Sequence, residues 1–253
     1  KPSIAARRRN RIRCDRRLAD AVMLAIEREL MSGLRPRPVR YAPPIEPYLT
    51  VLHYDKDIVA VSKQSGLLSV PGRGAQHADC VEARVRSRFP EATIVHRLDL
   101  DTSGVLLMAR SRDAHRDLAR QFELRQISKV YVARVWGTVR GDSGEIDAPL
   151  ICDWPNRPRQ IIDHRRGRQA HTTWCVLDRD RHSTRVHLMP KTGRSHQLRV
   201  HMLGLGHPIL GDNIYAHSAA LAAADRLQLH AEALEFRHPT SLAELTIEDT
   251  VPF

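Results

Sequence analysis

Paired cysteines are missing from this sequence. The four cysteines are far apart and none forms a CxxC pair: Cys14, Cys80, Cys152 and Cys175. This spacing argues against a structural zinc site and against the disulfide framework of a secreted protein. We therefore expect a reduced, cytoplasmic protein.

Long apolar runs, phosphate-binding loops and metal-ligand clusters are missing as well. No run reaches the roughly 20 apolar residues that span a bilayer, which argues against a membrane partner. The stretch VPGRG at 70–74 lacks the Lys-Ser/Thr of a P-loop, and the spacing of His196 and His201 is not that of an HExxH helix. We expect neither a metal nor a cofactor.

Positive charge is abundant and is concentrated at one end of the chain. The formal net charge is +11, of which residues 1–40 carry +8, from twelve Lys or Arg and four acidic residues. An Arg-rich segment such as AARRRNRIRCDRR can bind the phosphates of a nucleic acid. A solvated basic tail fits the composition equally well.

The chain divides into two parts. Apolar residues recur every four positions from Leu18 to Leu30, which predicts a helix, and residues 34–47 are rich in proline. We predict a basic N-terminal arm, a helix and a Pro-rich linker over 1–45, followed by one folded domain over 46–253.

The second part contains β-rich runs and amphipathic segments in irregular order. Alternating or continuous apolar runs predict strands, and apolar spacings of three to four predict helices. Strands are predicted at 48–55, 57–63, 104–110, 129–137, 157–163, 171–180, 183–190 and 242–249, a strand or mixed segment at 227–236, and helices at 79–89, 111–125 and 194–206. The pattern indicates an α+β fold with a mixed, mostly antiparallel central β-sheet and flanking helices.

Two carboxylates precede one of the buried strands, in the stretch VHRLDLDTSGVLLMAR. Asp99 and Asp101 could act as a pair of glycosidase acids, but such acids usually come from separate segments. Asp101 stands before a Thr-Ser-Gly turn, where its carboxylate can accept hydrogen bonds from backbone amides. Asp99, close to Arg97, is therefore the stronger candidate for catalysis.

Two other segments combine cations with a turn or an aromatic side chain. PKTGRSHQLRVHM places Lys191, Arg194 and His196 at a predicted helix start, where free N–H groups and the helix dipole favour phosphate. DWPNRPRQ places Trp154 beside Arg157, a combination suited to single-stranded RNA. Ordinary turns also hold such residues, and Trp154 could simply pack between prolines.

Several ordered motifs resemble those of the RluA family of pseudouridine synthases. HRLDLDTSG at 96–104 resembles its HRLD-x-x-TSG signature, and KQSGLLSVPG at 63–72 resembles its KPSGLLSVPG motif, with Gln64 in place of proline. KVYVARVWG at 129–137 and TGRSHQLRVHMLGLGHPILGD at 192–212 resemble the next two motifs. PLICDWPNRPRQ at 149–160 is similar to the members that modify both 23S rRNA and tRNA.

The resemblance covers 46–253 and implies a pseudouridine synthase catalytic domain without an S4-type RNA-binding domain. It implies that Asp99 is the catalytic aspartate, paired with Arg199, and that Tyr131 stacks on the target base and is a candidate base at C5. Arg97 would fill the space left by a flipped nucleotide, and His96 beside it is included among the RNA-binding residues. Leu229 would line the base pocket, although core packing explains it nearly as well.

The resulting interpretation is a cofactor-free RNA isomerase that acts as a monomer. Its expected partners are a 23S rRNA hairpin loop and the tRNA anticodon stem-loop. The alternatives are a synthase for a different rRNA uridine, or a catalytically silent RNA-binding or RNA-folding protein on the same scaffold, which would have no need for the Asp99, Tyr131 and Arg199 set. A glycosidase fits less well, because aromatic residues make up only 5% of the chain.

Overall fold

A computed structural model describes residues 41–253 of this chain. The basic segment and the helix expected between Leu18 and Leu30 lie outside the described residues, so both stay predictions. Within 41–253, no helix is both long enough and apolar enough to cross a membrane.

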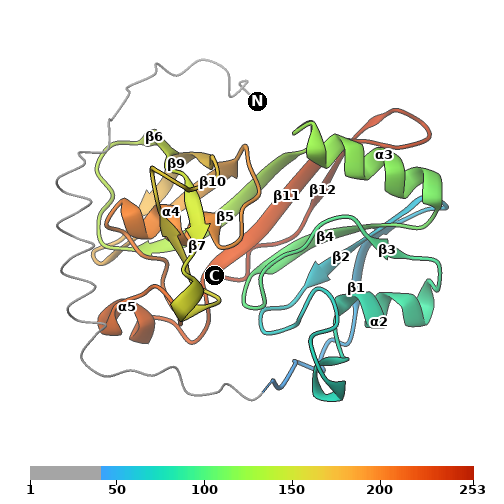
Figure 1. The fold of residues 1–253 in the computed structure, drawn as a ribbon, viewed down its shortest axis with the longest axis horizontal. Coiled ribbons are helices and arrows are strands. Elements are labelled where there is room, and N and C mark those ends of the chain that lie inside the picture. The colour runs from blue at the N-terminus through green and yellow to red at the C-terminus, as the bar shows by residue number, and fades with distance from the viewer. Residues whose placement is uncertain (1–40) are drawn as a thin grey trace.

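A ten-stranded sheet organises the described residues (Figure 1). Its strands are β1 (Thr50–Tyr54), β2 (Ile58–Lys63), β3 (Thr93–Ile94), β4 (Ser103–Ala109), β5 (Ser128–Trp136), β6 (Ser143–Asp147), β9 (His171–Arg179), β10 (Ser183–Pro190), β11 (Leu229–Arg237) and β12 (Glu244–Glu248). The main order is β1-β2-β4-β11-β5-β10-β9-β6, with β3 beside β4 and β12 beside β11. Among these strands only β4 and β11 pair in parallel, so the predicted mixed, mostly antiparallel α+β fold is confirmed.

Four α-helices are present in the described part: α2 (Val81–Arg88), α3 (Arg112–Glu123), α4 (Gln197–Gly204) and α5 (Ser218–Ala222). Two short 3-10 turns, Ala75–His77 and Trp154–Asn156, lie in the connections. The Ser111 hydroxyl accepts a hydrogen bond from the Ala114 N–H at 3.1 Å and so caps α3.

Strand β4 is buried on both faces, and every one of its residues is buried. Val105 and Leu107 pack into the apolar cluster that contains Leu118 of α3. Leu106 and Met108 point the other way, into the cluster that contains Val85 of α2. Because side chains alternate along a strand, β4 lies between two helices, and its N-terminal end is a rigid support for the turn before it.

A separate two-stranded hairpin, β7 (Leu150–Cys152) and β8 (Gln160–Ile162), lies outside the main sheet. The strand predicted at 157–163 is therefore shorter than expected and is paired only with β7. Pro158 explains the difference, because proline lacks the N–H that a strand ladder requires.

Candidate active site

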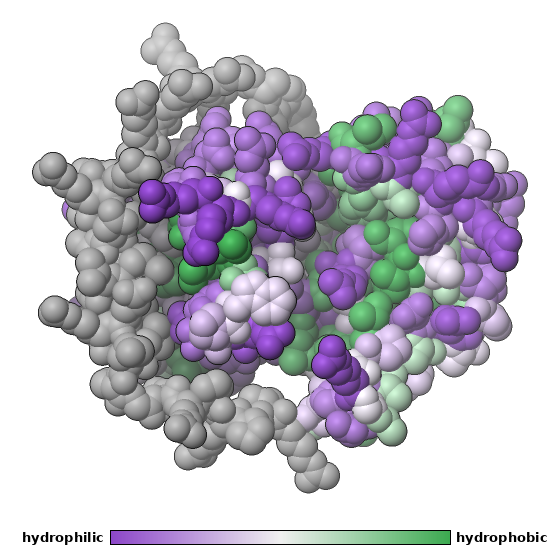
Figure 2. All heavy atoms as spheres, viewed as in Figure 1, coloured by the Kyte–Doolittle hydropathy of each residue, from purple (hydrophilic) through white to green (hydrophobic). Residues whose placement is uncertain are grey.

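Asp99 lies in the turn before β4, on the wall of a cleft of about 900 Å³. The Thr102 N–H donates to the Asp99 carbonyl at 3.2 Å and closes the turn. The Asp99 side chain is 30% exposed, so its carboxylate is partly desolvated yet open to a bound molecule. On the side of the molecule drawn in Figure 2 the surface is hollowed at its centre, and both apolar and hydrophilic side chains are visible in the hollow.

The segment 63–69 holds the Asp99 turn through its backbone. Two hydroxyl groups of this segment donate to carbonyls of the turn: Ser69 to Leu98 and Ser65 to Asp101, both at 2.7 Å. The Lys63 ammonium donates to the carbonyls of Leu100 (2.8 Å) and Thr102 (2.7 Å). The Gly66 N–H also donates to the Leu100 carbonyl, at 2.9 Å. These bonds satisfy carbonyls that water reaches poorly, and they fix the path of the turn. The motif KQSGLLS is thus the template on which Asp99 is placed.

Lys63 is almost completely buried, with 1% of its surface exposed. Its ammonium also donates to the Gln64 carbonyl at 2.9 Å, so all three protons are used. Burial lowers the pKa of Lys63 to about 7, although the charges of Asp101 and Asp99 act in the opposite direction. The unfolded chain would hold this proton up to a pH of about 10.4.

Lys63→Met should therefore change how stability depends on pH. Between pH 7 and about 10 the unfolded chain binds the Lys63 proton and the folded chain does not, so this group makes the unfolding free energy rise with pH. Denaturant unfolding of both proteins at pH 7, 8, 9 and 10 should show a wild-type rise of up to about 1.4 kcal/mol per pH unit beyond that of the variant. Parallel pH profiles would contradict the titration of Lys63 in the fold.

Arg199 binds Asp212 more closely than it binds Asp99. Its Nε and one terminal nitrogen donate to the two Asp212 oxygens at 2.7 and 2.6 Å. Its other terminal nitrogen, Nη1, lies 3.9 Å from Oδ2 of Asp99. Burial disfavours the guanidinium charge, but the hydrogen bonds and charge of Asp212 outweigh burial and raise the pKa of Arg199. Asp212 therefore orients Arg199 so that one nitrogen is left for Asp99.

The Asp101 side chain has a different partner from the one expected. Its Oδ2 accepts from the Asn213 side-chain amide at 3.1 Å, rather than from amides of the turn. Asn213 Oδ1 in turn lies 3.3 Å from an Arg199 nitrogen, from which it accepts. Asp101 thereby connects the Asp99 turn to the segment after α4, across more than 100 residues of sequence.

Tyr131 lies on β5 and also lines the cleft. Burial raises the pKa of its phenol, and the nearby Asp99 charge raises it further. The phenol is therefore protonated near neutral pH. In this state the ring can stack on a nucleobase, but the hydroxyl oxygen is not ready to accept a proton.

His96, Arg97 and Leu229 share the cleft wall but differ in character. The His96 Nε2 accepts from the Leu107 N–H at 2.9 Å, and burial lowers the pKa of this histidine to about 3. His96 is therefore neutral and holds the loop against β4, so it offers no charge to phosphate. Arg97 is exposed, and Leu229 is 3% exposed within the core cluster below the cleft.

The turn between β10 and α4 brings Lys191, Arg194 and His196 to the cleft. Gln197 organises this turn: its side-chain oxygen accepts from the Thr192 hydroxyl (2.7 Å) and from the Arg194 N–H (3.0 Å). Arg194 also donates from Nε to the Gln169 carbonyl at 3.1 Å. The predicted cationic turn is therefore rigid and faces the same cleft as Asp99.

Trp154 and Arg157 lie on the β7–β8 hairpin and do not line the cleft. The Arg157 guanidinium carbon is 4.7 Å from the centre of the Trp154 ring, and Trp154 is 66% exposed. Their neighbour Pro158 does reach the cleft wall. The exposed pair is therefore placed at the rim.

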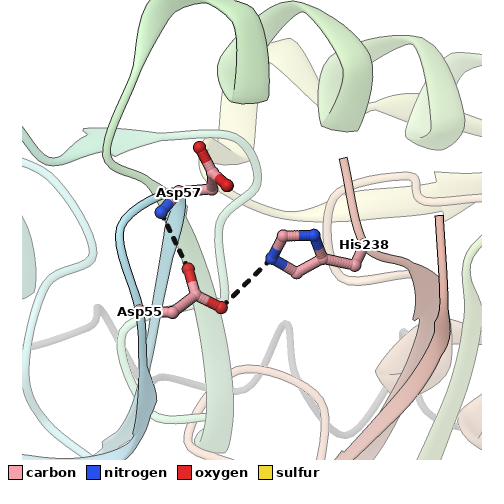
Figure 3. Close-up of side chains that lie close together, drawn as sticks. All are labelled: Asp55, Asp57 and His238. Atoms are coloured by element: carbon pink, nitrogen blue, oxygen red, sulfur yellow. Dashed lines mark hydrogen bonds and ion pairs between the residues drawn. The ribbon is translucent and has the colours of Figure 1, made fainter. Parts of the chain in front are cut away.

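A group of possible metal ligands lies away from this cleft, at Asp55, Asp57 and His238 (Figure 3). The His238 Nδ1 accepts from the backbone N–H groups of Thr240 (3.2 Å) and Ser241 (3.0 Å). Its Nε2 must then carry the proton, which it donates to Asp55 at 3.1 Å. A protonated Nε2 has no lone pair for a metal. The hydrogen bonds of His238 instead connect the turn at Asp55 to the turn that contains Thr240 and Ser241.

Sequence reasoning missed Asp212, Asn213, Tyr215 and the role of Lys63. A buried arginine requires a carboxylate partner, and the family resemblance supplied Asp99 for Arg199 rather than Asp212. No local pattern distinguishes which carboxylate that is.

Comparison with known proteins places the site in context. Residues 57–203 match the family described as RNA pseudouridylate synthase. A curated relative named dual-specificity RNA pseudouridine synthase RluA, from Yersinia pestis, is 56% identical over 192 residues, covering 76% of this chain and 93% of the relative. The relative of the same name from Escherichia coli (strain K12) is 51% identical over 214 residues, covering 84% and 98%.

Solved structures agree with these relatives. Human RNA pseudouridylate synthase domain containing 1 has a TM-score of 0.69 at 27% identity, covering 87% of each chain. Human RNA pseudouridylate synthase domain containing 4 has a TM-score of 0.66 at 24% identity, covering 92% of this chain and 93% of that one, a likeness of fold alone.

Proposed function

The chain belongs to the RNA pseudouridylate synthase family, and from this premise we propose that it isomerises uridines in both a 23S rRNA hairpin loop and the tRNA anticodon stem-loop. The dual substrates are supported by 51–56% identity to relatives named dual-specificity RNA pseudouridine synthase. The segment 149–160, which forms the hairpin at the cleft rim, supports them as well.

The observation that carries the catalytic assignment is the Asp99 carboxylate, held on the cleft wall with an Arg199 nitrogen 3.9 Å away. Isomerisation breaks the C1′–N1 bond, turns the uracil while it is held, and joins C1′ to C5; the hydrogen on C5 then leaves as a proton, and N1 gains a proton. The reaction needs no net redox change and no group donor. It does need a carboxylate beside the sugar, and Arg199 places a positive nitrogen 3.9 Å from that of Asp99.

Asp99 serves in either of two ways. It adds to C1′ as a nucleophile, or it removes the 2′ proton to give a glycal; both steps use the same carboxylate at the same place. The firm hold on the turn by 63–69 supports either step, because it keeps the carboxylate within reach of the sugar.

We assign base stacking to Tyr131. Its protonated phenol supports this role, and a role as the base at C5 would require the phenol to lose its proton first. Leu229 packs beside the base, and Arg97 occupies the gap in the RNA once the nucleotide has flipped.

The remaining contacts are assigned to the RNA backbone and loop. Lys191, Arg194 and His196, which line the cleft with Asp99, face phosphates and other RNA oxygens from the β10–α4 turn. Trp154 and Arg157 stack on or pair with nucleotides outside the flipped one. His96 supports the loop from below.

The proposal makes 46–253 the catalytic domain and adds the basic arm over 1–45 as a source of nonspecific RNA affinity. It places a monomeric enzyme in the cytoplasm with its RNA substrates.

Tritium release from [5-³H]uridine-labelled RNA tests the function. An anticodon stem-loop, a 23S rRNA hairpin and total cellular RNA should be compared, and each stem-loop should be paired with a version in which the loop uridines are replaced by cytidine. Tritium release from both stem-loops is expected, because both RNA loops would bind the same cleft and the same β7–β8 hairpin of the protein.

Release from only one stem-loop would reject dual specificity. Release from total RNA alone would indicate another uridine as the substrate. Binding without release from any of the three RNAs would indicate the silent RNA-binding protein.

A further inference from the structure

Tyr215 lies where the β7–β8 hairpin meets the catalytic cleft. Its hydroxyl accepts a hydrogen bond from the Gln160 N–H of β8 at 2.8 Å and lies 2.7 Å from Nδ1 of His196. The face of its ring is 5.2 Å from the Arg199 guanidinium carbon. The Arg159 guanidinium carbon lies 5.6 Å from the centre of the same ring, and Tyr215 is only 2% exposed.

The hydroxyl proton of Tyr215 determines which nitrogen of His196 is protonated. Burial raises the pKa of Tyr215, so the phenol keeps its proton near neutral pH. The Gln160 N–H is a donor and cannot accept that proton. Within residues 41–253, His196 Nδ1 is the acceptor at hydrogen-bonding distance from the hydroxyl. Nδ1 must then be unprotonated, and the ring proton lies on Nε2.

The free nitrogen of His196 is directed to the part of the site that binds substrate. His196 lines the cleft with Asp99 and stands at the start of α4 in the left-handed region, with φ 53°. Its Nε2 has no hydrogen-bond partner among the described residues. This atom is also not among the buried polar atoms without a partner, so solvent reaches it. The Nε2–H is therefore accessible from the cleft.

The charges around His196 do not overturn this state. Burial lowers its pKa; Asp99, Asp212 and Asp101 favour protonation, and Arg199 opposes it. Protonation would also put a second proton between Nδ1 and the Tyr215 hydroxyl, which would leave the phenol proton without an acceptor.

We propose that Tyr215 is a positioning residue that locks His196 as a neutral donor, with its Nε2–H directed at an oxygen of the RNA bound beside Asp99. The inference deepens the proposed function and rests on this cleft being the RNA site. The same hydroxyl accepts from the N–H of Gln160, three residues after Arg157. Tyr215 therefore contacts both the β7–β8 hairpin and His196 through one oxygen atom.

The RNA-free full-length protein allows a direct test by nitrogen NMR of the imidazole. Wild type should show His196 with an unprotonated Nδ1, a protonated Nε2 and a pKa below 6.5, with the signal assigned through His196→Gln. In Tyr215→Phe the neutral ring loses its donor, so the pKa should rise. Tyr41→Phe is the matched control, because the Tyr41 hydroxyl likewise accepts from a backbone N–H, that of Leu68 at 3.1 Å, and donates to a second group, the Asp79 carbonyl, at 2.7 Å.

A wild-type protein with the proton on Nδ1 would overturn the proposal, even if Tyr215→Phe proved too unstable to measure. An unchanged His196 pKa in a folded Tyr215→Phe would overturn it too. Neither outcome would touch the assignment of Asp99, because the measurement uses no substrate.

Kinetics then test the donor. His196→Ala should lower kcat/KM for the stem-loop about tenfold or more, and His196→Gln, which keeps a side-chain N–H, should recover part of that loss. Tyr215→Phe should lower kcat/KM in the wild-type background and add a fall in rate toward acidic pH. It should add little in the His196→Ala background, because the group it positions is gone. Full additivity would reject the coupling.

Discussion

Asp99→Asn should abolish tritium release while leaving RNA binding intact. The substitution keeps the size of the side chain and the backbone bonds that 63–69 make to the turn, but it removes the charge that the reaction uses. The loss in kcat should be on the order of 10⁴-fold or greater, as for the loss of a reacting group. Affinity for the stem-loop should be equal or higher, since one negative charge leaves a cleft that binds phosphates.

Asp101→Asn is the matched control for this prediction. Its carboxylate stands two residues away and accepts from Asn213 rather than facing the reacting sugar. Single-turnover release and an anisotropy titration on both variants would separate chemistry from binding. Activity of Asp99→Asn within tenfold of wild type would reject the catalytic assignment.

Asp212→Ala should be among the most destabilising single substitutions in the described part of the chain. Asp212 is 0% exposed, and it is the bidentate partner of an Arg199 that is 2% exposed. It also accepts from the backbone N–H groups of Ile214 and Tyr215 at 2.9 and 3.0 Å. Removing one member leaves a buried charge without its partner, which costs about 3–5 kcal/mol in the free energy of unfolding.

Asp113→Ala is the control for an exposed pair, because the Arg116 and Asp113 side chains are 79% and 90% exposed. Denaturant unfolding should show almost no change for this variant. Equal losses for the two variants would contradict the importance of burial at Asp212.

Replacing both partners separates stability from catalysis. Arg199→Met combined with Asp212→Leu should recover part of the stability lost in Asp212→Ala, because neither charge of this buried pair is left without its partner. The Ile214 and Tyr215 N–H groups still lack their acceptor, so recovery should be incomplete. The double variant should remain inactive, since Asp99 loses the nitrogen that lies 3.9 Å from it. Recovered activity would show that Asp99 needs no positive partner.

Local chemistry made several elements predictable. The strands expected at 129–137 and 183–190 and the helix expected at 111–125 are confirmed, because each depends on neighbours within a few residues. The strands expected at 48–55 and 57–63 are confirmed for the same reason, and they pair as β1 and β2. The four ordered motifs also identified the family correctly.

Pairing between distant segments was not predictable in the same way. The parallel contact of β4 with β11 joins Ser103 to His230, and nothing near either residue encodes the other. Strand β6 escaped prediction because Ser143–Asp147 holds a single isoleucine, which is flanked by two acidic residues. Its strand state comes from pairing with β9.

The sequence by itself determined which side chains are available for the chemistry: Asp99 before a buried strand, Tyr131 on a strand and Arg199 in an apolar helix. Tertiary structure alone decided their partners. It paired Arg199 with Asp212, directed Lys63 to the carbonyls of the Asp99 turn, and placed the Tyr215 hydroxyl against His196. The physical reason is burial: a charge or hydroxyl removed from water must find a partner, and which partner it meets depends on how distant segments pack.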